Sequence, residues 1–296
     1  MVGPTLAVFT KNNVNPAYTA ARLATDRVAA EAGARTVHYV PQTPDDVDEQ
    51  KALAAQALAA RPAAVLLNPA DDVKLAEDVE RFTAVGIPTV IFINRLPGQG
   101  IAFVGSDDKA IGASTANALC QGLGGKGRIV GLEGLAAVPT SRARVQGLRE
   151  TVARFPDIEL LDMAVGEMMQ APAKRAIGPL LARHEQIDGV WAANDLMAIG
   201  ALEALAEAGR AAKVVGINGL PVAIEQIEKG TMLASADFSA FNIAAIAARA
   251  ALRRLGGQPV PKEIMVPAEL IDRTNCARWK VPFEQRPCPE WHEIVE

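Results

Sequence analysis

The sequence lacks the features that mark membrane, nucleic-acid-binding and zinc-ribbon proteins. None of its apolar runs approaches the roughly 18 to 20 residues that a membrane-spanning helix needs. Lysine and arginine are not clustered and the net charge is only −4, which argues against a nucleic-acid surface. The chain has three cysteines and no CxxC pair, which argues against a zinc ribbon. Aromatic residues make up only 4% and alanine is abundant, a composition that suits helices packed closely on sheets.

Catalytic constellations are also missing. The sequence contains no GxSxG, Walker A or HExxH motif. The histidines, His38, His184 and His292, fall near no Ser or Cys in a nucleophile pattern. The glycine-rich segment 122–127 follows a helical pattern and precedes a strand, which is the wrong order for a phosphate-binding loop. We therefore predict a protein that is not an enzyme and that uses no cofactor and no metal.

The sequence leaves the cellular compartment open. Cys120 lies in a helical pattern as a small hydrophobic residue, whereas Cys276 and Cys288 flank a short irregular tail and could pair in an oxidising compartment. Met1 leads almost directly into an apolar strand, with no basic and apolar leader before it, so no signal peptide is expected in this chain. Either the protein is cytoplasmic or the sequence begins at a mature terminus with an added Met.

The positive signals begin with the segment around which the chain is organised. Leu6 to Phe9 form a short apolar run typical of a buried strand, and a polar turn follows over 10–15. Asn15-Pro16 is a helix start signal, since Asn caps a helix and Pro fits its first position. Open α/β sheets bind ligands just beyond the carboxyl ends of their strands, so this loop is a candidate ligand contact.

The same strand–helix pattern then repeats along the chain. Continuous apolar strands separated by helices indicate a parallel sheet covered on both faces. The further strands are expected at 36–40, 63–67, 89–93, 101–104, 128–132, 159–164, 189–192, 212–217, 233–236 and 264–266. The helices are expected at 17–32, 45–60, 73–85, 109–123, 141–155, 171–183, 196–208, 222–229 and 240–255. The remainder is proline-rich and is predicted to be irregular.

Two successive halves of similar size follow from this pattern. We predict an α/β fold with two doubly wound, Rossmann-like lobes. The N-terminal lobe is expected to comprise residues 1–105 and 237–265, and the C-terminal lobe residues 106–236 and 266–296 with the irregular tail. A cleft between such lobes would be lined by the carboxyl-end loops of both.

Polar residues of one kind recur at these strand ends. Asn offers both donors and an acceptor and Arg a planar set of donors, which suits a ligand covered in hydroxyl groups. The set comprises Lys11, Asn12, Asn13, Asn15, Asn68, Asn94, Arg95, Asn194, Asp195 and Asn218. The alternative for any single Asn is that it only caps a helix. Tyr18 and Phe238 could offer flat faces to a sugar ring, with core packing an equal alternative for Phe238.

These residues resemble the type I periplasmic binding proteins of the ribose-binding cluster, which share their fold with LacI-type effector domains. The resemblance covers nearly the whole chain, and its most specific part is the run from Ala193 to Leu202. It also rests on Asn15-Pro-Ala-Tyr18, Asn68-Pro69, Ile87-Pro88, Asn94-Arg95, the segment 104–107, Arg142-Ala-Arg144 and the segment 214–218.

The resemblance implies two lobes joined by a three-strand hinge that close on a monosaccharide or sugar alcohol. It further implies a monomer in the periplasm, its signal peptide removed, that delivers its ligand to the permease of an ABC importer and binds no nucleic acid. The implied ligand contacts are Lys11, Asn15, Tyr18, Asn94, Arg95, Arg144, Asn194, Asn218 and Ser239, with Met168 and Phe238 as apolar walls. Replacing Arg95 with Ala is expected to weaken binding by about 2 to 4 kcal/mol.

The chain departs from the family pattern in its acceptors. The family often has Asp where this chain has Asn94 and Asn218, while Lys11, Arg95 and Arg144 keep positive charge. An acidic sugar or another small polar acid is therefore the second ligand class, after a neutral sugar or polyol. A ligand-sensing effector domain of a regulator is a further alternative, disfavoured because the first strand begins at about residue 5 and leaves no room for a helix-turn-helix.

Overall fold

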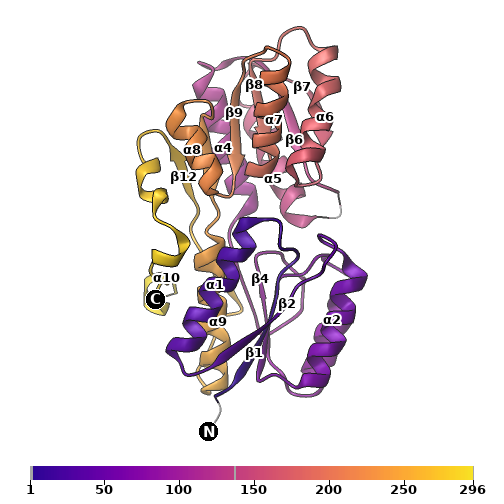
Figure 1. Ribbon diagram of the computed structural model, residues 1–296, viewed down its shortest axis with the longest axis vertical. Coiled ribbons are helices and arrows are strands. Elements are labelled where there is room, and N and C mark those ends of the chain that lie inside the picture. The colour runs from indigo at the N-terminus through magenta and orange to yellow at the C-terminus, as the bar shows by residue number, and fades with distance from the viewer. Residues whose placement is uncertain (1–2, 137, 296) are drawn as a thin grey trace. The chain divides into compact units, whose positions relative to one another are not determined.

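The computed structural model describes residues 3–136 and 138–295, and the chain divides into two compact units (Figure 1). Unit 1 comprises Met1–Ser106, Ser239–Val266 and Pro282–Glu296, and unit 2 comprises Asp107–Phe238 and Pro267–Val281. The two units are described separately. No helix within the described ranges combines the length and the apolar character that crossing a bilayer requires.

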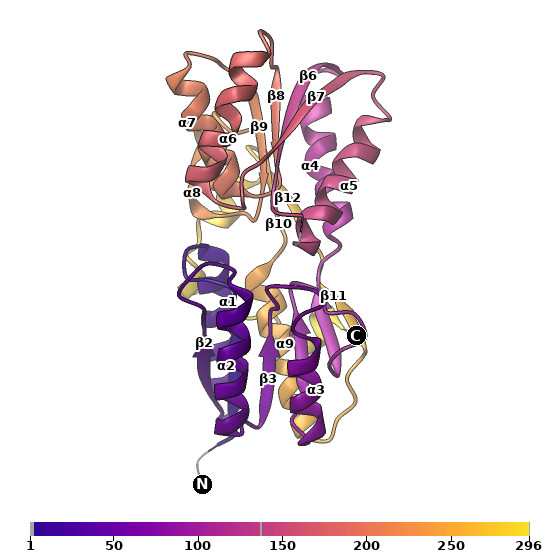
Figure 2. The same cartoon turned by 90° about the vertical axis from the view of Figure 1, so that its right-hand side faces the viewer.

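Unit 1 is built on a six-stranded parallel sheet with the order β11-β5-β4-β3-β1-β2. Its strands are β1 (Thr5–Phe9), β2 (Arg35–Tyr39), β3 (Ala64–Leu67), β4 (Thr89–Phe92), β5 (Ala102–Gly105) and β11 (Glu263–Met265). Its helices are α1 (Pro16–Glu31), α2 (Val47–Ala60), α3 (Ala76–Ala84), α9 (Ala240–Leu255) and α10 (Trp291–Ile294). Helices α1 and α9 cover one face of the sheet and α2 and α3 the other (Figure 1, Figure 2).

Alanine lets the covering helices of unit 1 come close to each other and to the sheet. Helix α1 packs on α9 and buries Ala17, Ala20, Ala21 and Ala24, and the buried face of α9 is also largely alanine. The central strands β3 and β4 are buried throughout, as continuous apolar strands covered on both faces must be. This packing fixes the carboxyl ends of β1, β3 and β4 at one edge of the sheet.

Unit 2 repeats the architecture with the strand order β12-β10-β9-β8-β6-β7. Its strands are β6 (Lys126–Glu133), β7 (Asp157–Val165), β8 (Gly189–Ala192), β9 (Lys213–Ile217), β10 (Ala234–Asp237) and β12 (Glu269–Asp272). Its helices are α4 (Asp108–Gly122), α5 (Pro139–Val152), α6 (Gln170–Arg183), α7 (Asp195–Glu207) and α8 (Pro221–Lys229). Helices α4 and α5 lie on one face of the sheet and α6 and α7 on the other (Figure 2).

Two glycines allow α4 and α5 to touch through their backbones. A Cβ on Gly112 would lie 2.2 Å from the carbonyl oxygen of Arg144, and one on Gly147 would lie 2.1 Å from that of Lys109. Such distances leave no room for a side chain, so the close approach depends on both glycines. The contact holds Arg144 against the first turns of α4.

The expected strands and helices are present with ends shifted by a few residues, but the region after β11 differs from the prediction. Residues 269–272 form β12, antiparallel to β10, where an irregular segment was expected. This short edge strand buries only Ile271 fully, so it carries no apolar run that a sequence pattern could detect. Trp191, in β8, is fully buried and donates from Nε1 to Thr115 Oγ1 at 3.0 Å.

The end of the chain also differs from the expected lobe boundaries. Residues after Val281 return to unit 1, so the chain passes between the units after residues 106, 238, 266 and 281, one passage more than a three-strand hinge requires. Arg27 donates to the carbonyl of Arg286 at 2.8 Å, and Arg249 donates from Nε to that of Pro289 at 2.9 Å. Trp291 is buried there. These contacts with α1 and α9 join the tail to unit 1.

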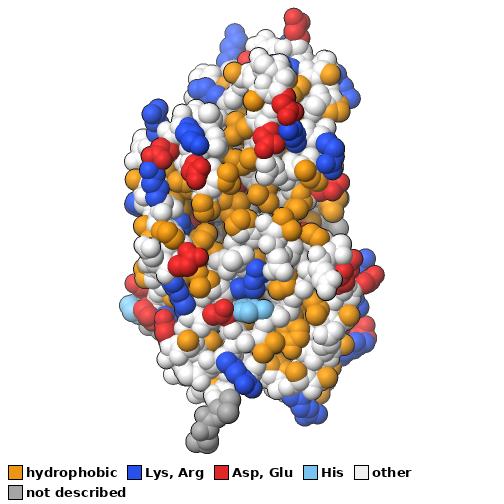
Figure 3. Space-filling model, viewed as in Figure 1, with side chains coloured by type: hydrophobic (Ala, Val, Ile, Leu, Met, Phe, Trp, Pro, Cys, Tyr) orange, Lys and Arg blue, Asp and Glu red, His pale blue; other side chains and the backbone are white. Residues whose placement is uncertain are grey.

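All three cysteines lie within the described residues and are free thiols. The pairing of Cys276 with Cys288 that was left open above is therefore not formed. On the face drawn in Figure 3, charged side chains of both signs are interspersed among hydrophobic ones. That mixture agrees with the small net charge of −4.

Candidate functional site

The loop after β1 is folded by its own asparagines. Asn12 Oδ1 accepts hydrogen bonds from the backbone N–H groups of Val14 at 3.1 Å and Asn15 at 2.9 Å. Asn15 in turn caps α1, its Oδ1 accepting from Ala17 N at 3.0 Å. The capping alternative is therefore correct for the oxygen of Asn15, which leaves its amide NH₂ as the group available to a ligand.

Lys11 is a buried cation at this strand end. Its side chain is 3% exposed, and Nζ lies 3.5 Å from Asp45 Oδ2 and 5.9 Å from the centroid of the Tyr18 ring. Burial by itself would lower the pKa of Lys11, but Tyr18 and Asp45 outweigh it and the pKa is raised. For Tyr18, whose charged form is the anion, burial raises the pKa. The ammonium is thus charged and compensated by Asp45, which also accepts from Asn12 Nδ2 at 2.7 Å.

Asn68 follows β3 directly. It belongs to the polar set found at the strand ends, but it is not among the ligand contacts that the resemblance to the family implies. It is 0% exposed, and among the described residues neither its Nδ2 nor its Oδ1 makes a hydrogen bond of normal geometry, although it lies near enough to the Tyr18 hydroxyl to lower that group's pKa. A buried amide without partners costs about 1 to 3 kcal/mol. Its position as an Asn directly after a buried strand was the available signal.

Asn94 and Arg95, adjacent in the sequence, diverge in the structure. Asn94 is buried and donates from Nδ2 to the carbonyl of Pro69 at 2.9 Å, which joins the ends of β3 and β4. Arg95 is 49% exposed, pairs with Glu263 and places its guanidinium 4.1 Å from the centroid of the Phe103 ring. Asn94 is therefore bonded to the residue that follows Asn68, whereas the Arg95 side chain extends to Glu263 in β11.

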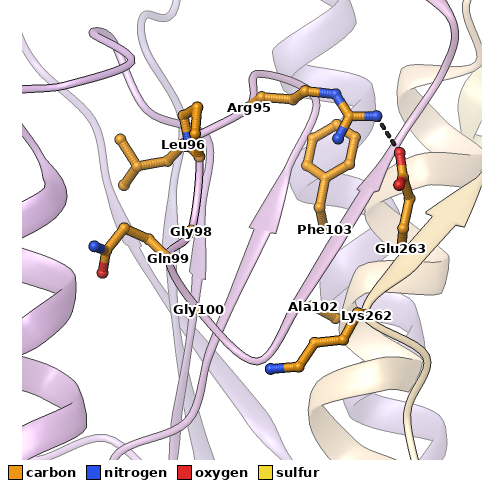
Figure 4. Close-up of a pocket in the computed structure, with 10 residues that line it drawn as sticks. Arg95, Leu96, Gly98, Gln99, Gly100, Ala102, Phe103, Lys262 and Glu263 are labelled. Atoms are coloured by element: carbon orange, nitrogen blue, oxygen red, sulfur yellow. Dashed lines mark hydrogen bonds and ion pairs between the residues drawn. The ribbon is translucent and has the colours of Figure 1, made fainter.

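Arg95 lines a pocket of about 540 Å³ within unit 1 (Figure 4). The pocket is formed by the loop from Arg95 to Gly100, by β5 and by Lys262 and Glu263. Figure 4 shows the Arg95 side chain extending over Phe103 to Glu263. The ligand role predicted for Arg95 would require its guanidinium to leave Glu263.

Arg144 organises the strand ends of unit 2. It is 3% exposed, donates from Nε to Asp108 Oδ1 at 2.8 Å and from Nη1 to the carbonyl of Ala193 at 2.8 Å. Its guanidinium carbon lies 5.3 Å from the centroid of the Phe238 ring. Two predicted residues, Arg144 and Phe238, are thus in contact, and the carboxylate of Asp108 compensates the charge.

Asn194 and Met168 are joined by a hydrogen bond. Asn194 Oδ1 caps α7 by accepting from Met197 N at 2.8 Å, and Nδ2 donates to the carbonyl of Met168 at 2.8 Å. Both polar atoms of this fully buried side chain therefore have protein partners. Asn218 follows β9, is buried, and donates from its backbone N to the carbonyl of Ala236 at 2.8 Å.

Strained backbone is concentrated at these strand ends. Ile93, Met168, Asn218 and Ser239 have φ values of 63°, 59°, 140° and 62°, which side-chain-bearing residues rarely adopt. Ile93 is the most unusual, because β-branched residues are least tolerant of positive φ. Such strain costs of order 1 to 3 kcal/mol per residue and persists where the surroundings over-determine it, commonly at ligand sites. Each of the four is, or directly precedes, a predicted contact.

The structure thus forms two sets of candidate residues, one in each unit. The unit 1 set is Lys11, Asn15, Tyr18, Asn68 and Asn94, and the unit 2 set is Arg144, Met168, Asn194, Asn218 and Phe238. Ser239 is the first residue of the chain's return to unit 1 and is 9% exposed. Each set combines amides, one charge-compensated cation and one aromatic ring, which can hydrogen-bond hydroxyl groups and cover an apolar face.

No metal site adds to these sets. Within residues 3–136 and 138–295, no group of three or more His, Cys, Asp or Glu side chains is arranged to hold a metal ion.

Two α/β units, each with a mainly parallel sheet and polar groups at its strand ends, define the fold class of the type I periplasmic binding proteins. The chain belongs to the periplasmic binding protein family, whose domain model matches residues 6–259.

Among similar proteins, a D-apiose import binding protein of Paraburkholderia graminis is 26% identical over 92% of this chain and 88% of its own length. A ribose import binding protein of Bacillus subtilis is 27% identical over 90% of this chain and 85% of its own length. A xylitol-binding protein of Mycolicibacterium smegmatis is 33% identical over 57% of this chain and 50% of its own length.

Solved structures agree with this assignment. A periplasmic solute-binding protein of an ABC transporter from Actinobacillus succinogenes, with bound D-allose, is 26% identical with a TM-score of 0.90, covering 93% of this chain and 99% of that one. A solute-binding protein from Mycobacterium smegmatis, with bound glycerol, is 26% identical with a TM-score of 0.87, covering 93% of this chain and 96% of that one. The predicted family and fold class are therefore confirmed.

Proposed function

We propose that this protein binds a neutral monosaccharide or sugar alcohol, contacted by both sets of candidate residues together, and delivers it to the permease of an ABC importer. The contacts are the unit 1 set, the unit 2 set and Ser239. The protein acts as a monomer in the periplasm, makes and breaks no covalent bond in its ligand, and binds no nucleic acid. The names of the relatives support this ligand class, since they include D-apiose, ribose and xylitol.

The observation that carries the choice of a neutral ligand is the internal pairing of the cations. Lys11 is paired with Asp45, Arg144 with Asp108, and Arg95 with Glu263. A cation that already has a carboxylate partner gains little from an anionic ligand, because the ligand would have to compete with that partner. The amides and the rings then determine recognition, and both suit hydroxyl groups on a carbon skeleton.

A ligand panel tests the proposal. Purified protein is screened by thermal shift and then by calorimetry against pentoses, hexoses, pentitols and hexitols, with the matching aldonic and uronic acids as the second class. A ligand at 100 times its dissociation constant stabilises the folded state by about 2.7 kcal/mol. We expect stabilisation by a neutral member, and stabilisation by the acids alone would contradict the proposal.

The remaining parts of the proposal have separate tests. Ligand recovered after incubation is expected to be chemically unchanged by NMR. Light scattering is expected to give the mass of one 31.2 kDa chain. Osmotic-shock fractionation of the native host is expected to release the protein with the periplasmic contents, and retention in the cytoplasm would contradict the location.

A further inference from the structure

Asp195 is a buried carboxylate at the carboxyl end of the unit 2 sheet. It is the first residue of α7 and is 0% exposed. Its Oδ2 accepts from Leu220 N at 2.8 Å, and its Oδ1 accepts from Ser235 Oγ at 2.6 Å. Ser235 Oγ in turn accepts from Gly219 N at 3.1 Å. A chain of hydrogen bonds therefore joins α7, the loop between β9 and α8, and β10.

This arrangement exceeds what the start of a helix requires. An acidic residue in the first turn complements the helix dipole from an exposed position, whereas complete burial of a carboxylate costs several kcal/mol. Strand β9 makes room for it with Gly216, where a Cβ would lie 2.4 Å from Asp195 Oδ1. Burial raises the pKa of Asp195 to about 7, although the Ser235 and Leu220 hydrogen bonds act to lower it.

The loop that Asp195 holds carries a predicted ligand contact in an unfavourable conformation. Asn218 and Gly219 have φ values of 140° and 65°, so the segment needs external restraints to stay in place. Backbone hydrogen bonds from Gly219 and Leu220 to the Ser235–Asp195 pair supply them. Asn194, the residue before Asp195, is the other amide of this set.

We propose that Asp195 and Ser235 are positioning residues of the ligand site: they hold Gly219 and Leu220 so that the Asn218 side chain keeps one orientation relative to Asn194. The proposal rests on the function proposed above, because Asn218 and Asn194 are its ligand contacts. An ionised carboxylate accepts from both Leu220 and Ser235. When the carboxylate is protonated, one of its oxygens carries the hydrogen and no longer accepts, so one of the two restraints is weakened. Ligand affinity is therefore expected to fall as Asp195 is protonated. The charged groups acting on Asp195 are Arg144 from α5 and Asp237 from β10.

Three variants test the proposal. Asp195→Asn removes the charge and one acceptor, and Ser235→Ala removes only the relay to Gly219. Asp188→Asn is the matched control, because Asp188 Oδ2 also accepts a backbone hydrogen bond, from Arg128 N at 2.7 Å, ahead of β8 at the amino end of the same sheet. Amide hydrogen exchange of residues 218–220 is measured without ligand, and affinity for the best ligand of the panel is measured from pH 6 to pH 8.

We expect the wild-type affinity to fall several-fold between pH 8 and pH 6. Asp195→Asn should bind about tenfold more weakly at pH 8, the loss of one charged hydrogen bond, and should show no change with pH. Ser235→Ala should bind a few-fold more weakly and keep the pH dependence. Exchange at Gly219 and Leu220 should quicken in Asp195→Asn, and exchange at Gly219 alone in Ser235→Ala, while Asp188→Asn changes none of these.

Unchanged exchange at Gly219 and Leu220 in Asp195→Asn would overturn the positioning role, as would a wild-type pH profile retained in that variant. If Asp195→Asn does not fold, Ser235→Ala decides by the same exchange measurement at Gly219. If the wild-type protein binds no sugar or polyol, the proposed function fails separately, and the exchange data still decide whether the two residues hold the loop.

Discussion

The two units carry candidate sets of similar chemistry, and the hydrogen-bonding groups of the two sets are already used by the protein to different degrees. In unit 2, Arg144 donates to Asp108 and to the carbonyl of Ala193, and both polar atoms of Asn194 are used by the protein. In unit 1, the Asn68 amide is fully buried and makes no hydrogen bond of normal geometry among the described residues. Preorganised groups lose little freedom on binding, whereas an unpaired buried amide gains its first hydrogen bonds from the ligand. Unit 2 thus supplies a rigid surface and unit 1 unused hydrogen-bonding capacity.

The largest effect is expected from breaking the rigid set of unit 2. Arg144→Ala removes the Nε donor to Asp108 and the Nη1 donor to the carbonyl of Ala193, and removing one partner of a buried ion pair costs about 3 to 5 kcal/mol. Urea unfolding should show a loss of this size, and calorimetry should show no ligand binding. The control is Arg149→Ala, five residues later and exposed on the same helix, which should change stability by less than about 0.5 kcal/mol. Equal effects of the two substitutions would contradict a central role for Arg144.

A comparable effect is expected from pH, again in unit 2. The pKa of Asp195 is raised from 3.8 to about 7, so the folded chain keeps a proton that the unfolded chain releases. The stability from this proton is present below about pH 4 and is lost as the pH rises to about 7, a total of about 4 kcal/mol. Asp195→Asn should remove this slope from urea unfolding measured between pH 4 and pH 8. If the variant keeps the same change of unfolding free energy with pH, groups other than Asp195 cause that change.

As the pH rises, the stability of the protein is expected to fall and its affinity for the ligand to increase. Ionising Asp195 is expected to cost stability, whereas the further inference assigns to the ionised form the better positioning of Asn218. Opposed trends of this kind are common where a site requires a strained or poorly solvated group.

The comparison between the units is tested most directly by a pair of asparagines. Asn68→Ala in unit 1 should weaken ligand binding about tenfold yet leave stability unchanged or raise it by about 1 kcal/mol, because the lost amide makes no hydrogen bond of normal geometry among the described residues. Asn194→Ala in unit 2 should weaken binding similarly but lower stability by about 0.5 to 2 kcal/mol, the cost of losing a helix cap. Urea unfolding and calorimetry on both variants measure the contrast. Equal destabilisation by both would remove the distinction between the units.

The smallest effect is expected at Arg95. Its guanidinium is 49% exposed and paired with Glu263, so Arg95→Ala should lower stability by no more than about 1 kcal/mol and change affinity by a similar amount. The resemblance to the family implies a loss of about 2 to 4 kcal/mol in binding. Calorimetry distinguishes these values, with Glu263→Gln as the companion variant. A loss of the larger size, together with tighter binding by Glu263→Gln, would show that Arg95 leaves Glu263 for the ligand.

Much of the fold could be predicted because its signals are local. Apolar strands, helix start signals such as Asn15-Pro16 and polar strand ends are each read within a few residues. The strand-end asparagines and Lys11 were found for the same reason, whereas Arg144, Met168 and Ser239 entered the contact list through the resemblance to the family. The missed features lack such a pattern. Strand β12 buries only Ile271 fully, and the return of the tail to unit 1 depends on contacts such as that of Arg27 with the carbonyl of Arg286.

The sequence by itself determined the alternation of strands and helices, and with it the edge of each sheet where the polar residues lie, because side-chain periodicity and strand direction need no distant partner. Only the tertiary structure decided which cations are compensated, which amides are satisfied and where the tail returns. Arg144 and Asp108 are 36 residues apart, Lys11 and Asp45 are 34 apart, and Asp195 and Ser235 are 40 apart. Charge compensation and burial are properties of such distant pairs, and they exist only once the sheets have brought the strand ends together.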